Sequence, residues 1–303
     1  MVDVTHKPKT LRKASAEGLI KIQKETIDRV KNDSLPKGNL FDIARAAGLL
    51  GAKQTPMLIP HCHPVVIDYL EVNFKIDEAA GAINVSASGS SISRTGIEME
   101  VLTAVSTALL TIYDLLKPID KQMEITGIRL LDKKGGRKIK DTEKYSKFKA
   151  AVLVVSDSTA AGERKDNSGK IIKEMVESYN LPIGDYQIVP DEIDQIQEKV
   201  LGWINQDIPF IFTTGGTGLG PRDVTVEAIE EIAERKVEGI GEAMRSYGQE
   251  RTLKAMLSRS FACTIQKSVV LCLPGSSAGA RESLEAILPE LFHARKMIDG
   301  GGH

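Results

Sequence analysis

The chain has 303 residues, of which 42% are hydrophobic and 27% are charged, and its formal net charge is -1. This length is more than one hydrophobic core usually fills, so two domains are expected, while the composition is that of an ordinary soluble globular protein. The near-neutral charge excludes a general attraction to nucleic acid or to a membrane surface, although local basic sites can still bind a small anion.

The cysteines and the N-terminus indicate a cytoplasmic protein. There are three cysteines, Cys62, Cys263 and Cys272, and a sparse, odd set argues against a disulfide framework and favours a reducing compartment. The first residues lack the apolar segment of a secretory signal, and no run approaches the roughly 18 apolar residues of a membrane-spanning helix. We therefore expect neither a membrane nor a nucleic-acid partner.

The first half of the chain mixes helices with strands of alternating polarity. Helices are expected over residues 15–30, 40–53 and 96–117, and strands over 70–76, 82–86 and 123–131. Asn39 can cap the second helix, and residues 70–76 alternate apolar and polar side chains as a half-buried strand does. The helix over 96–117 is apolar around much of its surface, so we expect more than its own sheet to cover it, as at a subunit contact. This order predicts an α+β fold.

A charged stretch separates the two halves. Residues 133–149 contain Gly135 and Gly136 and show little apolar periodicity, which is typical of a linker. A basic run of this kind is more often a solvated connector than a binding patch. The predicted division is a first domain over residues 1–136, a linker over 137–147 and a second domain over 148–303.

In the second half, continuous apolar strands alternate with helices. Strands are expected over residues 151–155, 186–189, 210–213 and 269–273, with helices over 168–179, 192–205 and 241–257, after Asp223, and finally up to Met297. Uninterrupted apolar strands of this kind are buried on both faces. The alternation therefore predicts βαβ units and a parallel sheet between two layers of helices.

Polar groups gather at the expected carboxyl ends of these strands. Asp157, Asp191 and Asp223 each follow a strand, and the last belongs to the glycine-rich run TTGGTGLGPRDVT over residues 213–225. Open α/β sheets bind ligands at this edge, and glycines let backbone N–H groups converge on an anion. Acids here could bridge through Mg²⁺ to nucleotide phosphates, although each alone could equally be a helix N-cap. The run is neither a P-loop nor the dinucleotide fingerprint, so a nicotinamide cofactor is not favoured.

The second half resembles a known family. The motifs SDS, GxxxDxSG, VPDE, TTGGTGLGPRDVT and LPGS follow one another as in the molybdopterin adenylyltransferase family (MogA/MoaB-like), from about Phe148 onwards. The resemblance implies a Rossmann-like three-layer α/β fold and transfer of AMP from Mg·ATP to the terminal phosphate of molybdopterin, with release of pyrophosphate. It implies Asp191 and Asp223 as the critical acids, with Asp223 as a Mg²⁺ ligand. The implied nucleotide and pterin pockets are lined by Ser156, Asp157, Gly215, Gly216, Thr217, Gly218 and Ser276.

One departure keeps a second interpretation open. The family commonly has proline after DVT, where this chain has Val226. Loss of a proline at a helix start costs rigidity more than chemistry. The same fold also serves in proteins that bind partners without turnover, so the alternative is a non-catalytic molybdopterin-binding or assembly module.

In the first half, the segment IPHCHP over residues 59–64 concentrates two histidines and a cysteine. If the segment is extended, His61 and His63 share one face and Cys62 points the other way. A zinc site needs three or four protein ligands, and in a chain with five histidines and no CxxC a metal is not favoured. A satisfied core histidine is the common alternative.

This segment and its neighbours resemble the cyclic pyranopterin monophosphate synthase (MoaC) family, over residues 1 to about 136. The matching segments are KGNLF from Lys37, IPHCHP, TGIEME from Thr95 and DLLK from Asp114. The resemblance implies a ferredoxin-like fold, a hexamer built from dimers with sites at subunit contacts, and no cofactor. The implied reaction converts 3′,8-cyclo-7,8-dihydroguanosine 5′-triphosphate to cyclic pyranopterin monophosphate with loss of pyrophosphate.

The resemblance also assigns roles to residues. Asp114 and Lys117, at i and i+3 of one helix, would perform acid/base work, with Lys117 as the general acid; a plain surface ion pair is the alternative. Lys37 would close over the substrate on a loop that Gly38 lets move, and His63 would be an acid/base and phosphate-binding group. The implied substrate-binding residues are Lys7, Arg12, Lys53, Cys62, His63, Glu98, Met99, Glu100 and Lys133.

The whole chain is therefore expected to be a fusion of two molybdenum cofactor enzymes. It would be a homo-oligomer whose partners are small molecules, namely the cyclic guanosine triphosphate, molybdopterin and ATP, with Mg²⁺ needed in the second half alone. The two steps are not consecutive, so direct channelling between the halves is not expected. His61 and Asn39 stand where the family has other residues.

Overall fold

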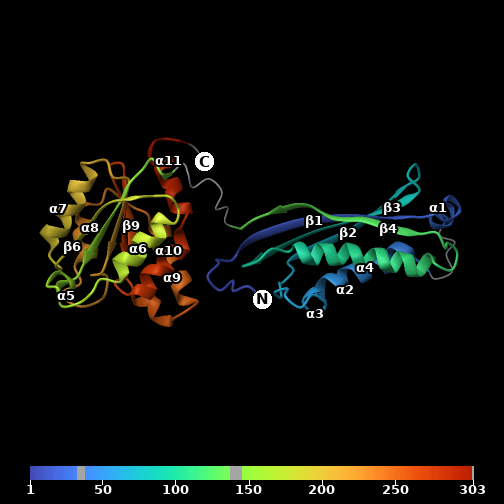
Figure 1. Cartoon of the computed structure of the whole chain (residues 1–303), viewed down its shortest axis with the longest axis horizontal. Helices are drawn as coiled ribbons and strands as arrows, with labels where there is room; N and C mark the ends of the chain where they lie inside the picture. Colours follow the sequence, from blue (N-terminus) through green and yellow to red (C-terminus); the bar gives the residue numbers. More distant parts are fainter. Residues whose placement is uncertain (33–37, 137–144, 302–303) are drawn as a thin grey trace. The chain divides into compact units, whose positions relative to one another are not determined.

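The computed structural model describes residues 1–32, 38–136 and 145–301. The chain divides into two compact units, Met1–Arg137 and Lys138–His303, both drawn in Figure 1. The predicted linker lies outside the described residues except for its last three positions, and so does Lys37.

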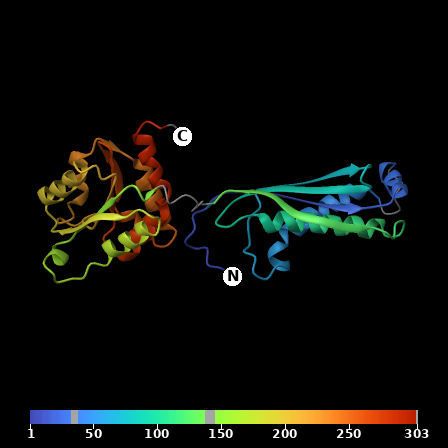
Figure 2. The same ribbon diagram turned by 45° about the horizontal axis from the view of Figure 1, so that its top comes forward.

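The first unit is an antiparallel sheet with helices on one face. Its elements are β1 (Thr10–Lys21), α1 (Lys24–Lys31), α2 (Leu40–Lys53), α3 (Thr55–Leu58), β2 (Tyr69–Asp77), β3 (Ala82–Ser93), α4 (Glu98–Leu116) and β4 (Glu124–Lys134). The strands lie in the order β2-β3-β1-β4, and every neighbouring pair is antiparallel. Helices α2 and α4 pack together, and α4 covers the sheet (Figures 1 and 2). The predicted α+β fold is confirmed, and Asn39 caps α2 as expected.

The helix expected over residues 15–30 is wrong in its first part, which continues strand β1; helix α1 begins afterwards. Ala16 and Gly18 alternate with polar residues and are buried. A Cβ at Gly18 would lie 2.8 Å from Leu109 Cδ1, so glycine lets α4 approach the sheet. Small side chains at a period of two give little hydrophobic signal, which is why the strand was missed.

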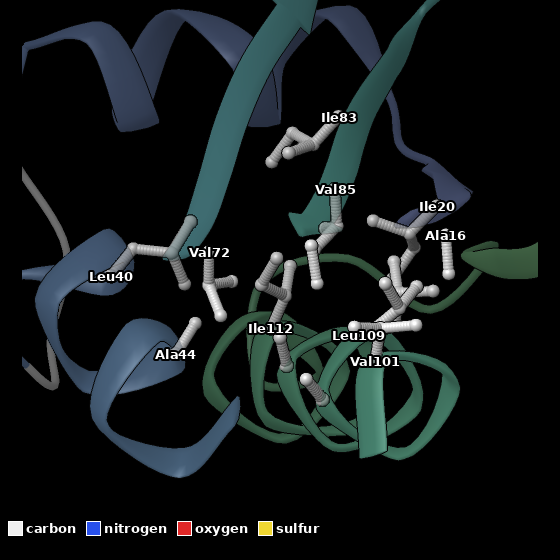
Figure 3. Close-up of a cluster of buried hydrophobic side chains, with 14 of the residues drawn as sticks. Ala16, Ile20, Leu40, Ala44, Val72, Ile83, Val85, Val101, Leu109 and Ile112 are labelled. Carbon is white, nitrogen blue, oxygen red and sulfur yellow. The ribbon is translucent and has the colours of Figure 1, made fainter. Parts of the chain in front are cut away.

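Helix α4 is the centre of this unit's core. Val101, Leu109 and Ile112 on α4 are fully buried, and Figure 3 shows them beside Ile83 and Val85 of the sheet. Contrary to the expectation from sequence, α4 is long and apolar enough to cross a membrane, by length and composition alone, and it is the one helix of the described residues that is. Burial of one face against the sheet accounts for part of that composition, and 44% of the apolar stretch is buried.

The second unit is a mixed sheet between two layers of helices. Its elements are β5 (Ala150–Val155), α5 (Asp157–Ala160), α6 (Ser168–Glu177), β6 (Ile183–Val189), α7 (Ile193–Ile204), β7 (Phe210–Thr214), α8 (Thr225–Ile232), β8 (Arg235–Lys236), α9 (Glu238–Gln249), η2 (Leu253–Leu257), β9 (Phe261–Ile265), β10 (Ser268–Leu273), α10 (Ser277–Ile287), η3 (Glu290–His293) and α11 (Ala294–Ile298). The strand order is β6-β5-β7-β10-β9-β8. Separate hydrophobic clusters fill its two faces, and every residue of β5 and β10 is buried.

The expectation of a purely parallel sheet is wrong at one edge. Strands β6, β5, β7 and β10 are parallel as predicted, but β9 pairs antiparallel with β10, and β8 with β9. A two-residue turn through Gln266, at φ 51°, joins β9 to β10, as in a tight hairpin. Glutamine is not a residue that signals such a turn, so the hairpin had no marker in the sequence.

Two predicted helices are divided. The helix expected over residues 241–257 is α9 followed by the 3-10 turn η2. The final helix is interrupted after Ile287, because Leu288 precedes Pro289 and adopts an extended backbone with ψ 145°. Proline sterically disfavours the helical conformation of the residue before it.

Candidate active sites

A pocket of about 330 Å³ opens at the carboxyl edge of the second unit's sheet. It lies where β5, β7 and β10 end, because parallel strands present their carboxyl ends at one edge. Of the residues predicted to act or bind in this half, its lining contains Ser156, Asp191, Gly215, Gly216, Asp223 and Ser276. The predicted residues outside its lining are Asp157, Thr217 and Gly218.

Asp157 and Asp191 hold two loops of this edge together. The Asp157 N–H donates to Asp191 Oδ2 at 2.9 Å, and the Asp191 N–H donates to Asp157 Oδ1 at 3.0 Å. Arg222 donates to both carboxylate oxygens of Asp157 through Nε and Nη2, each at 3.0 Å. The hydrogen bonds from Arg222, and then that from the Asp191 N–H, lower the pKa of Asp157. Asp157 thus fastens the loops, which differs from the expectation that all three aspartates face one metal ion.

Asp191 and Asp223 remain as the acids of the pocket. Withdrawal from water raises the pKa of Asp191, and the charges of Asp157 and Asp223 raise it further. A divalent cation would relieve this repulsion. No three acidic, histidine or cysteine side chains of the described residues are grouped to hold a metal. Two carboxylates completed by phosphate oxygens and water nevertheless suit Mg²⁺, so the residues present fit that ion.

The glycine-rich loop curls around the Asp223 carboxylate. The Gly220 N–H donates to Asp223 Oδ2 at 2.8 Å. Gly215 has φ +98°, and a Cβ there would lie 2.1 Å from Val155 O, so only glycine lets the loop cross the end of β5. Ser276, which also lines the pocket, caps α10 through its side chain. The conformation of the loop is therefore fixed by backbone sterics at one end and by a carboxylate at the other.

Arg259, which no motif indicated, ties the same loop together. Its Nε donates to Gly218 O and its Nη2 to Asp223 O, both at 2.7 Å, and its Nη1 pairs with Glu227. Its backbone N–H donates to Thr217 O at 3.2 Å. These partners are remote in sequence, so no local pattern could have revealed the contact.

Replacing Arg259 with methionine is expected to lower the free energy of unfolding by about 1.5–3 kcal/mol, because part-buried carbonyl groups of Gly218 and Asp223 lose a charged donor. Urea unfolding monitored for the second unit would measure this. The Gly220 amide should also exchange its hydrogen faster. Arg235→Met, at an exposed position on β8, is the matched control. Equal stability and equal amide protection in both variants would contradict the assignment.

In the first unit, predicted substrate-binding residues meet at the N-terminal end of α4. Lys133 Nζ lies 3.3 Å from Glu98 Oε1. Arg12 donates to the carbonyl oxygens of Ser93 and Arg94, each at 3.3 Å. Burial lowers the pKa of Arg12, and the charge of Glu98 opposes that shift, so the two side chains are neighbours. The cluster offers cations beside an acid.

Glu100 and Cys62 extend this cluster inward. Glu100 is only 1% exposed, and the Cys62 thiol lies 3.9 Å from its Oε1. Its other oxygen, Oε2, has no hydrogen-bond partner among the described residues. Burial raises the pKa of both groups. A buried oxygen without a partner is costly, so it marks a place where a ligand could donate a hydrogen bond.

The predicted acid/base pair lies at the other end of α4. Lys117 Nζ is 2.5 Å from Asp114 Oδ1, and both side chains are 56% exposed. The hydrogen bond to Asp114 raises the pKa of Lys117, which keeps its ammonium protonated. At ~1.5 Å of rise per residue, the helix separates Asp114 from Glu98 by ~24 Å. One chain therefore does not bring the two groups together.

The histidine segment begins with a turn. The Cys62 N–H donates to Ile59 O at 3.0 Å, so the segment is not extended at His61, and the condition for His61 and His63 to share one face is not met there. His61 is exposed, with its Nδ1 3.3 Å from the Met1 amino group. His63 is half-buried next to Cys62 and thus close to the Glu100 cluster.

The remaining predicted residues lie on the surface. Lys53 is the last residue of α2 and is exposed. Lys7 is exposed, and its carbonyl oxygen accepts from Arg94 Nε at 3.1 Å. Met99, on α4, is 38% exposed. The exposed side chains of Lys7 and Met99 leave the N-terminal end of α4 open to solvent.

Comparisons with known proteins match the two halves of the chain to different family models. The MoaC family model matches residues 1–136, and the model of a probable molybdopterin binding domain matches residues 151–293. A molybdenum cofactor biosynthesis bifunctional protein of Chlorobaculum tepidum is 43% identical over 303 residues, covering 100% of this chain and 96% of its own. A cyclic pyranopterin monophosphate synthase of Clostridium acetobutylicum is 44% identical over 137 residues, covering 45% of this chain and 85% of its own.

Among solved structures, the molybdopterin biosynthesis enzyme MoaB from Thermus thermophilus is 42% identical, with a TM-score of 0.48, covering 50% of this chain and 97% of its own. The match to the Chlorobaculum protein extends over both halves of the chain. The chain therefore belongs to the family of bifunctional molybdenum cofactor biosynthesis proteins, with a MoaC-family unit followed by a unit that matches the model of a probable molybdopterin binding domain.

Proposed function

We propose that the first unit converts 3′,8-cyclo-7,8-dihydroguanosine 5′-triphosphate to cyclic pyranopterin monophosphate and pyrophosphate. The names of its relatives support this reaction, and the β-α-β-β-α-β order of the unit supports a ferredoxin-like fold for it. The observation that carries the proposal is the Asp114–Lys117 pair at 2.5 Å, a protonated amine held by a carboxylate on an exposed surface.

The proposed roles follow from charge and burial. Lys117 donates a proton to the substrate and regains one from solvent, while the Asp114 carboxylate orients the ammonium group. Arg12 and Lys133, with His63 nearby, neutralise the triphosphate. Glu100 accepts a hydrogen bond from an N–H of the guanine-derived ring, which gives its unpartnered oxygen a donor.

The site is completed by a second protomer. The ~24 Å of helix between the two clusters is longer than a nucleoside triphosphate, so one substrate molecule cannot reach both in one chain. Exposed apolar side chains near α4 support a contact between copies, with Leu110 63% exposed on α4, Leu50 55% on α2 and Met57 86% on α3. Large exposed apolar residues of this kind often mark protein–protein contacts. A hexamer built from such dimers is the proposed assembly.

Mixing two inactive variants tests this arrangement. Lys117→Met and Arg12→Met, each in the full chain, should be nearly inactive alone. In a symmetric dimer, co-expression in equal amounts should restore about a quarter of the sites, because half of the dimers are mixed and each mixed dimer has one intact site. The pterin product is measured after feeding the cyclic guanosine triphosphate. Failure to regain activity in mixed oligomers that form normally would exclude a shared site.

For the second unit, the proposed activity is transfer of AMP from Mg·ATP to molybdopterin. Asp191 and Asp223 would hold Mg²⁺, which would neutralise phosphate charge. The basic residues Arg164 and Lys165 also line the pocket and can bind phosphate oxygens. Closely placed cations and backbone N–H groups support in-line attack on the α-phosphate by holding both reactants.

The alternative is a unit that binds molybdopterin without turnover, and the description of the matching family model favours pterin binding itself. Val226, which replaces the usual proline, is buried, and α8 still begins at Thr225. The substitution therefore leaves the helix start in place. Pyrophosphate release distinguishes the two functions, as described in the Discussion.

A further inference from the structure

Thr225 places a buried hydroxyl group directly beneath the glycine-rich loop. It is the first residue of α8 and is 0% exposed. Its backbone N–H donates to Gly216 O at 3.1 Å. Its side-chain Oγ1, however, has no hydrogen-bond partner among the described residues. A buried hydroxyl without a partner destabilises the state that contains it. A state in which the hydroxyl gains a hydrogen-bond partner is therefore favoured relative to this one.

The Asp191 carboxylate is an acceptor close to this hydroxyl group. Gly216 has φ +62°, and a Cβ built on it would lie 2.2 Å from Thr225 Oγ1 and 3.0 Å from Asp191 Oδ1. The hydroxyl and the carboxylate therefore approach the same point from two elements, with only the bare glycine between them. A small movement of the carboxylate would bring the two groups to hydrogen-bond distance.

The direction of that movement is set by the pocket. Asp191 lines it together with Asp223, whereas Asp157, the other neighbouring acid, is held by Arg222. A carboxylate that turns toward a cation in the pocket exposes its remaining lone pairs to the Thr225 hydroxyl. A hydrogen bond to an ionised carboxylate is among the stronger ones in proteins.

We propose that Thr225 is a positioning residue of the second-unit site, whose hydroxyl donates to the Asp191 carboxylate when Mg²⁺ and nucleotide phosphate are bound. This inference rests on the function proposed for that site. In the unbound state the Thr225 hydroxyl is unpaired, and in the bound state it donates a hydrogen bond to Asp191. A purely structural hydroxyl would be paired in both states.

The test uses Thr225→Val, which replaces the hydroxyl with a methyl group of similar size, and Thr225→Ser, which keeps the hydroxyl. Without ligand, Thr225→Val should unfold at the same urea concentration as the native full chain, or at a higher one. Mg·ATP affinity, measured by calorimetry without molybdopterin, should fall about tenfold in Thr225→Val. In Thr225→Ser it should remain within about twofold of the native value.

The possible results distinguish failure of the proposed Thr225 role from failure of the proposed adenylyltransferase function. Native affinity in Thr225→Val would overturn the inference alone, as would loss of stability in the unbound Thr225→Val protein, since that would indicate a structural role. Absence of Mg·ATP binding by the native chain would overturn both the inference and the adenylyltransferase proposal. Tenfold weaker binding with intact stability, restored by serine, supports it.

Discussion

Asp114→Asn is expected to reduce kcat for cyclic pyranopterin monophosphate formation by about 10²–10⁴-fold, the usual contribution of a positioned acid/base group. The amide keeps the size of the carboxyl group but removes its charge. Lys117 then loses the negative charge that lies 2.5 Å from its ammonium group and helps to raise its pKa. The measurement is product formation from the cyclic guanosine triphosphate under saturating substrate.

The control for this variant is another exposed ion pair of the same unit. Asp42 and Arg45 on α2 are also an i,i+3 pair, at 2.8 Å, and their side chains are 67% and 43% exposed. Exposed pairs of this kind contribute little to stability, so Asp42→Asn and Asp114→Asn should both fold normally. A rate of Asp114→Asn close to that of Asp42→Asn would reduce the Asp114–Lys117 pair to a surface ion pair.

Asp223→Asn should lower molybdopterin-dependent pyrophosphate release from ATP by at least ~10²-fold, the effect expected when an electrostatic group of the reacting centre is lost. Asparagine Oδ1 can still accept the hydrogen bond that the Gly220 N–H gives to Asp223. The loop should therefore stay folded, and the variant isolates the charge. Mg²⁺ titration should show weaker binding in parallel.

Asp194→Asn, at an exposed position in the first turn of α7, is the matched control for Asp223→Asn. If native protein and Asp223→Asn release pyrophosphate at the same background rate while both bind molybdopterin, the second unit is a binding module. Normal turnover by Asp223→Asn would instead show that another group holds the metal or that no metal is needed.

Most strands and helices of the second unit could be predicted from the sequence because its central strands have a plain apolar pattern. Strands such as β5 are buried on both faces and read as unbroken apolar runs, so the parallel part of the sheet could be inferred. Strands β8 and β9 could not be inferred, since they have only two and five residues and such short segments carry no periodic pattern. In the first unit, β1 shows little hydrophobic periodicity because it contains Ala16 and Gly18. At Gly18 the small size reflects the approach of α4 and not a local preference.

The candidate sites were predictable only as far as local motifs extend. Asp191, Gly216 and Asp223 stand in recognisable runs and do line one pocket. The roles of Arg259 and of the buried Thr225 hydroxyl depend on contacts between distant segments. The hydrogen bonds from Arg222 to Asp157 do so too. Tertiary packing alone creates such contacts, so composition and spacing do not reveal them.

Helix α4 gives the proposed synthase an inherent dependence on protein concentration. Its substrate-binding cluster and its proton donor occupy opposite ends of a single rigid rod, so an isolated protomer possesses two half-sites and no complete one. Dilution to a concentration at which the protomers dissociate should therefore abolish formation of cyclic pyranopterin monophosphate. The second unit has its pocket within one chain, so its nucleotide binding should persist under the same dilution.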